Sequence, residues 1–119
     1  MAAIDPLDPL RRICLALPEA TQQRTWESET FRVRAKIFAM YSNDDGPPQV
    51  WVKGRAGDQE VLISAAPNRF FKPPYLGPKG WIGIWLGENT DWDEVEDLVS
   101  TSYRLVAPKR LSALLDPPD

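Results

Sequence analysis

The chain has 119 residues, of which 43% are hydrophobic and 26% are charged, and its formal net charge is −3. This length suits one domain with its own core, and the apolar content with five tryptophans excludes an intrinsically disordered chain. One cysteine and no histidine exclude an internal disulfide and the usual zinc, copper or haem ligands, so we expect no metal and no cofactor.

The N-terminal region indicates where the protein is found. Residues 1–10 contain Asp5, Asp8 and two prolines, and they lack the basic start and apolar run of a secretory signal. No apolar run approaches the roughly 20 residues that a membrane-spanning helix needs. We therefore expect a cytoplasmic protein that makes no membrane contact. We also expect a monomer that forms a single domain, residues 1–119.

The first predicted element is a helix over residues 9–17. Asp8 is a suitable N-cap, and Pro9 is suited to the first helical position. One apolar helical face is formed by Leu10, Ile13, Cys14 and Leu17. Pro18 then stops the helix. Cys14 is expected to be a buried, unreactive side chain on this face.

Strands are predicted next. Residues 30–41 read as two strands, because polar and apolar residues alternate and the segment is rich in β-branched and aromatic side chains. A tight turn near 34–36 must separate them, although it lacks the usual glycine. Residues 42–48 form a loop, and 49–53 form a third strand. The simplest arrangement is a three-stranded antiparallel meander.

The middle of the chain is less regular. Residues 58–66 fit either a helix or a strand. Residues 69–80 contain several Pro and Gly residues and are expected to form an extended loop or a strand edge. Residues 81–86 form a strand with large apolar groups on both faces, where Trp81 and Trp85 point the same way and are expected to pack in the core.

A long helix is predicted to begin after its N-cap Asp91 and to end before Pro108. Its apolar face is formed by Val95, Leu98, Val99, Ser102, Leu105 and Val106. Residues 86–99 carry acids and no bases, which we interpret as a solvated, dipole-matched helix start rather than a metal site. Residues 109–115 are expected to add one short helical turn.

Three segments together give the chain a resemblance to the MmcQ/YjbR-like family over about residues 8–110. They are residues 31–39, residues 73–81 with their Pro-Pro-Tyr-Leu-Gly sequence, and residues 91–106. The resemblance implies an α+β fold of the frataxin-like (CyaY-like) type, in which helices pack on one face of an antiparallel sheet. It also implies a double-wing arrangement, a helix over residues 57–66 and DNA binding. Arg34-Ala35 stands where the family often has glycine, so the turn type stays open.

A DNA-binding surface is therefore the first functional hypothesis. Phosphate binding needs clustered Lys and Arg side chains, and base stacking needs exposed aromatic rings such as those of Phe71 or Tyr75. The candidate residues are Arg32, Arg34, Lys36, Lys53, Arg55, Arg69, Lys72, Tyr75 and Lys79. On this hypothesis the protein is not an enzyme, and it binds DNA weakly, with little sequence preference and strong salt dependence. In the competing interpretation the cations are ordinary solvated residues and the aromatic side chains belong to the core.

Another kind of binding is also possible for the same segment. Residues 69–81 could line a pocket for a small ligand or a peptide, with the nearby cations serving to clamp an anion. No catalytic residue is predicted, because without histidine no Ser-His-Asp or Cys-His site can form. The spacing of Tyr75 and Lys79 resembles a reductase pair, but Gly77-Pro78 forbids the helix that would align them.

Overall fold

The computed structural model describes residues 5–25, 28–43 and 46–116, and their strands form one six-stranded antiparallel sheet of order β1-β2-β3-β4-β6-β5. The strands are β1 (Thr21–Thr25), β2 (Ser28–Val33), β3 (Lys36–Ser42), β4 (Gln49–Lys53), β5 (Phe70–Phe71) and β6 (Trp81–Trp85). The helices are α1 (Leu7–Leu15), α2 (Asp58–Ala65), α3 (Trp92–Val106) and α4 (Lys109–Ser112), with short 3-10 turns η1 (Gly77–Lys79) and η2 (Ala113–Leu115).

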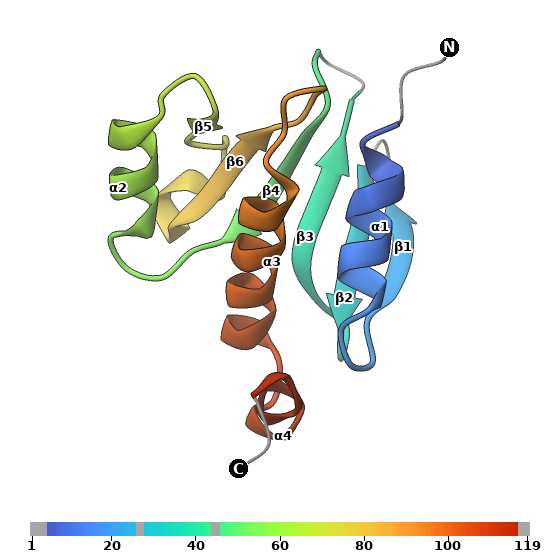
Figure 1. Cartoon of the computed structure of the whole chain (residues 1–119). Coiled ribbons are helices and arrows are strands. Elements are labelled where there is room, and N and C mark those ends of the chain that lie inside the picture. The colour runs from blue at the N-terminus through green and yellow to red at the C-terminus, as the bar shows by residue number, and fades with distance from the viewer. Residues whose placement is uncertain (1–4, 26–27, 44–45, 117–119) are drawn as a thin grey trace.

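The predicted fold class is confirmed. Helices α1 and α3 cover one face of the sheet, and α2 lies beside its β5–β6 end (Figure 1). The helix implied for residues 57–66 is present as α2. The three-stranded meander is present as β2-β3-β4, but the sheet is larger. Strand β1 was not predicted, because its sequence, TQQRT, does not alternate between apolar and polar residues.

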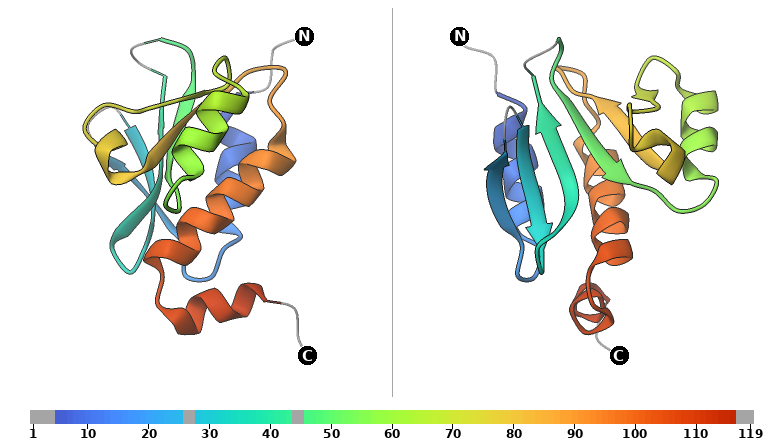
Figure 2. Two further views of the ribbon diagram at one scale, coloured as in Figure 1. Left: turned by 90° about the vertical axis from the view of Figure 1, so that its left-hand side faces the viewer. Right: turned by 180° about the vertical axis from the view of Figure 1, so that it is seen from behind.

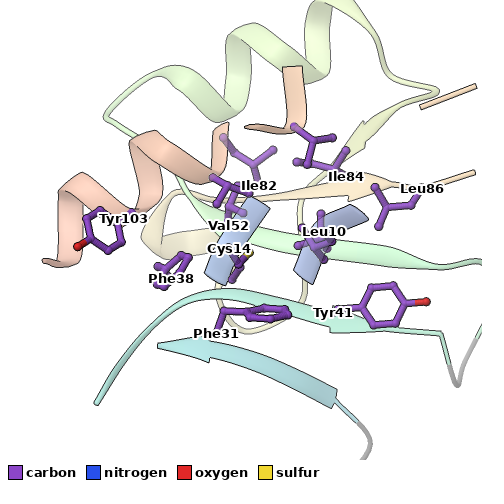
Figure 3. Packing of buried hydrophobic residues seen from close by; sticks show 14 of the residues in the cluster. Leu10, Cys14, Phe31, Phe38, Tyr41, Val52, Ile82, Ile84, Leu86 and Tyr103 are labelled. Atoms are coloured by element: carbon purple, nitrogen blue, oxygen red, sulfur yellow. The ribbon is translucent and has the colours of Figure 1, made fainter. Parts of the chain in front are cut away.

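The core lies between α1, α3 and the sheet. Alternate residues of the strands face the helices, among them Phe31, Tyr41, Val52 and Ile84, and they pack against Leu10 and Tyr103 from α1 and α3 (Figure 3). Cys14 is buried in this layer, as predicted, and its burial raises the pKa of the thiol well above the ordinary range. The thiol is therefore protonated and unreactive at neutral pH.

Helix α1 begins earlier than predicted. Its N-cap is Pro6 and its first residue is Leu7, so Asp8 lies in the first turn, where it pairs with Arg11 at 2.9 Å. Pro9 is tolerated at the third helical position because the first four N–H groups of a helix have no acceptor within the helix. The predicted N-cap at Asp8 was therefore wrong by two residues.

The β2–β3 turn is made without glycine. Arg34 and Ala35 both adopt left-handed backbone conformations, with φ of +51° and +67°. Two successive left-handed residues give the hairpin the twist that matches its strands, which is the reason glycine or asparagine is usual there. The backbone of this turn is therefore strained. An ion pair between Arg34 and Glu19, at 2.7 Å, links the turn to the segment before β1.

Ser102 of α3 joins two strands where their own pairing ends. Strands β3 and β4 pair from Ala39–Val52 to Ser42–Gln49, and beyond this they diverge around α3 (Figure 2). The buried Ser102 hydroxyl donates to the carbonyl of Phe38 at 2.6 Å and accepts the N–H of Lys53 at 2.9 Å. One side chain thus satisfies both backbone groups that the interrupted ladder leaves unpaired.

Within the part of the chain that the structure describes, no helix combines the length and apolar content needed to cross a bilayer.

We predict that Ser102→Ala lowers the free energy of unfolding by about 1–3 kcal/mol, because it leaves a buried N–H and a buried carbonyl without a partner. Urea unfolding followed by tryptophan fluorescence measures the change. Ser100→Ala is the matched control, since Ser100 is on the same helix, is half-buried and makes no hydrogen bond with its hydroxyl among the described residues. Equal effects of the two substitutions would contradict this account of Ser102.

Candidate functional site

The face of the sheet that is turned away from α1 and α3 carries a row of large side chains. In the strand register Met40 pairs with Trp51, Trp51 with Gly83, and Gly83 with Phe71. A Cβ atom at Gly83 would lie 2.3 Å from the Phe71 ring, so that ring lies directly over the glycine backbone. Phe71 also stacks on Trp85, with the ring centroids 4.3 Å apart and an interplanar angle of 29°. Glycine at position 83 is what allows this row to lie flat on the sheet.

These side chains line a groove of about 460 Å³, which we call the aromatic groove. It is lined by Ser28, Met40, Ser42, Gln49, Trp51, Phe71, Pro74, Tyr75 and Trp85. In the view along the sheet edge, the segment leading into η1 lies on the side opposite α3 (Figure 2). None of the described residues that line the groove carries a formal charge at pH 7, so this part of the groove suits a neutral group.

Tyr75 stands at the rim of this groove in a strained conformation. The N–H of Leu76 donates to the carbonyl of Pro74 at 2.7 Å, which closes a three-residue γ-turn with Tyr75 at its centre. The φ of Tyr75 is +66°, the sign that makes a γ-turn strained for a residue with a side chain. Its side chain is 91% exposed, so core packing does not offset the strain. Strain held at an exposed aromatic residue indicates a functional position.

Two further tryptophans complete the groove. Trp85 is 37% exposed although its predicted place was the core, and that prediction was wrong because no described α-helix covers this end of β6. Trp81, on the same side, is buried as predicted. Trp51 donates its indole N–H to Oε1 of Gln49 at 2.7 Å. Trp92 packs against the core, and Trp26 lies outside the described residues.

Three of the predicted DNA-contacting arginines are held by carboxylates. Arg34 pairs with Glu19 at 2.7 Å, Arg55 with Asp58 at 3.3 Å, and Arg69 with Glu94 at 2.8 Å. The hydrogen bond from Arg34, aided by its charge and opposed by desolvation, keeps the pKa of Glu19 below its usual range. In each pair a carboxylate contacts the guanidinium group that would otherwise bind a DNA phosphate.

The remaining predicted residues lie in separate places. Lys72 and Lys79 line a different cavity of about 340 Å³ with Arg55, beside the start of α2. Arg32 and Lys53 lie on the face that carries the aromatic groove, since the Nε of Arg32 donates to Thr30 at 3.2 Å and Lys53 alternates with buried Val52. Lys36 is exposed at the β2–β3 turn. Tyr75 is the one predicted site residue that lines the groove.

Sequence reasoning missed most of the groove. Phe71 and Tyr75 were anticipated as stacking residues, but Met40, Trp51 and Gln49 were not. A signal was available in β4, where Trp51 falls between the buried Val50 and Val52 and must therefore face away from the helices. A tryptophan on the outer face of a strand is a feature that packing in the core does not explain.

The acidic run at the start of α3 is occupied by structural interactions. Asp91 is the N-cap, as predicted, and accepts the N–H of Glu94 at 3.2 Å, while the Glu94 side chain pairs with Arg69. Among the residues described, no group of three or more carboxylate or thiol side chains is arranged to hold a metal ion.

Comparison with known proteins gives the family. A family model described as YjbR matches residues 15–105. The chain belongs to the YjbR family. It is 29% identical over 101 residues to the uncharacterised protein YbdF of Escherichia coli O157:H7, covering 81% of this chain and 80% of that protein. The fold is similar to the crystal structure of the Deinococcus radiodurans protein DR2400, with a DUF419 domain, at a TM-score of 0.77 and 24% identity. That similarity covers 95% of this YjbR chain and 89% of the other.

We predict that Tyr75→Gly raises the free energy of unfolding by up to about 1 kcal/mol, because glycine adopts a positive φ without steric cost and little packing is lost. Thermal and urea unfolding measure the change. Ala35→Gly, at the similarly strained and exposed turn, serves as the control and should stabilise by a comparable amount. A loss of more than about 1 kcal/mol for Tyr75→Gly would mean that the ring supports the fold instead.

Proposed function

We propose that this protein is a non-enzymatic binding module whose ligand inserts a neutral, planar group into the aromatic groove. The observation that carries this proposal is the lining, in which the described residues include four aromatic side chains and no charged one. Those aromatic residues are Trp51, Phe71, Tyr75 and Trp85. Because the described lining residues include no Asp, Glu, Lys, Arg or Cys, they supply no ordinary acid-base or nucleophilic pair.

The size and form of the groove support this function. Its volume of about 460 Å³ falls within the range of small-molecule sites, and predominantly apolar walls with a few polar groups are typical of them. Trp85 offers an exposed edge beside Phe71, and Tyr75 projects at the rim. A flat ring placed between them gains both area burial and aromatic contact, the latter worth about 0.5–1.5 kcal/mol per ring pair.

The positions of the cations favour this function over a continuous basic face for duplex DNA. Arg34, Arg55 and Arg69 each share their charge with a neighbouring carboxylate. Lys72 and Lys79 belong to another cavity. A duplex phosphate backbone would meet alternating signs across these positions, which weakens the attraction on which sequence-independent binding depends.

We predict that the neutral fluorescent dye N-phenyl-1-naphthylamine binds the protein, and that Trp85→Ala and Tyr75→Ala each weaken its binding by about fivefold or more, since each removes a ring contact. Dye fluorescence measured against protein concentration gives the Kd. Val61→Ala is the control, because Val61 is an exposed apolar residue on α2 outside the groove. Equal loss in all three variants, or no dye binding, would exclude the groove as the site.

Single-stranded nucleic acid is a second candidate ligand, favoured by one observation. Arg32 and Lys53 share the face of the aromatic groove, and neither makes an ion pair among the described residues. A base could stack in the groove while a neighbouring phosphate contacts one of these cations. DNA binding is therefore still proposed, but for single-stranded DNA, in which the bases are unpaired.

We predict that, on this second candidate, a fluorescent oligothymidine of about ten nucleotides binds at low salt more tightly than a duplex of the same length. Fluorescence anisotropy measures both. Lys53→Ala should weaken oligothymidine binding and reduce its salt dependence, whereas Lys109→Ala, on α4, should leave both unchanged. A preference for the duplex would instead favour the basic-face hypothesis.

Other properties follow as proposals of the same kind. We infer a frataxin-like, double-wing arrangement from the way β3 and β4 diverge around α3. Cytoplasmic location is proposed because the single cysteine is buried and the fold needs no disulfide, and a monomeric state is kept as a proposal beside it.

A further inference from the structure

We propose that Gln49 determines which ligands the aromatic groove accepts, by donating a hydrogen bond from its amide nitrogen to an acceptor atom on the edge of a neutral, planar heterocycle. This inference rests on the proposed function, and it narrows the ligand from any planar group to one that carries a ring nitrogen or carbonyl at its edge.

The first step concerns the orientation of the Gln49 amide. An indole N–H can only donate, so the atom of Gln49 that lies 2.7 Å from Nε1 of Trp51 must be the carbonyl oxygen. The chemistry of the partner thus fixes which end of the amide is which. Trp51 holds Oε1, and the amide nitrogen Nε2 is directed elsewhere.

The second step concerns the free donor. No carboxylate, carbonyl or hydroxyl among the described residues accepts a hydrogen bond from Nε2 of Gln49. Gln49 lines the groove and sits in the sheet between Ser42 of β3 and Trp85 of β6. Two N–H groups are therefore available beside the exposed Trp85 ring, where a stacked ligand would present its edge.

The third step concerns the charge of the acceptor. Because no Lys or Arg is among the described residues of the lining, a carboxylate or phosphate placed there would lose its hydration without a counter-ion from them. A neutral acceptor loses less hydration free energy, and one hydrogen bond from an amide donor replaces its hydrogen bond to water. Ser28 and Ser42 add hydroxyls that serve as donor or acceptor, so they do not alter this preference.

The experiment compares two probes of equal shape, naphthalene and quinoline, which differ by replacement of one ring CH with an acceptor nitrogen. Their Kd values are measured at pH 7.5 from shifts of the groove resonances in ¹H–¹⁵N spectra of the full chain. The isosteric change Gln49→Glu keeps the acceptor for Trp51 and replaces the donor with a second acceptor. We expect the preference for quinoline over naphthalene to fall by about tenfold, because a hydrogen bond is lost and lone pairs are opposed.

Two further variants keep the result unambiguous. Gln23→Glu makes the same charge change on the same face but outside the groove, and it should leave the preference unchanged. Gln49→Met removes the donor without adding charge and should also lower the preference. If both probes bind and the preference is the same in all variants, the role of Gln49 is overturned while the groove stands. If neither probe shifts the groove resonances, the proposed function falls as well.

Discussion

The packing of α3 against both β3 and β4, where these two strands diverge, is the constraint from which the rest of the structure follows. Ser102 can replace one rung of the sheet ladder because its hydroxyl both donates to Phe38 and accepts from Lys53. The neighbouring Tyr103 fixes the depth of the helix through an edge-to-face contact with Phe38 and a hydrogen bond to the carbonyl of Pro18. With α1 and α3 packed on one face of the sheet and α2 beside its β5–β6 end, no described α-helix covers the opposite face at the aromatic groove.

That uncovered face explains why the candidate site is aromatic. An outward-facing strand position normally carries a polar residue, yet here β4, β6 and the β5 segment present Trp51, Trp85 and Phe71. Partly exposed rings in one row lower solubility and contribute little to the core. Tyr75 adds backbone strain to the same place. The lowered solubility and the backbone strain are reasonable where a bound ligand buries the rings. The uncovered face of the sheet is in this way connected to the proposed function.

The sequence predicted the parts of the fold whose signals are local. Asp91 marked the start of α3, Gln49–Lys53 marked β4, and Cys14 marked the buried face of α1. It failed for β1, which is polar and stable only as a partner of β2, and for the first turn of α1. The site was harder to predict because its residues come from five strands and a loop. Only the pairing register of the strands brings Met40, Trp51 and Phe71 into one row. That register depends on residues that are far apart in the sequence.

The most direct test of a ligand site on the uncovered face uses the indole N–H signals of the five tryptophans. A library of neutral, planar fragments is added to ¹⁵N-labelled protein, with signals assigned by single Trp→Phe substitutions. The account predicts that fragments shift the signals of Trp51 and Trp85, while those of Trp92 and the buried Trp81 move little. Shifts confined to Trp92, or to the backbone around Lys72 and Lys79, would place binding elsewhere and contradict it.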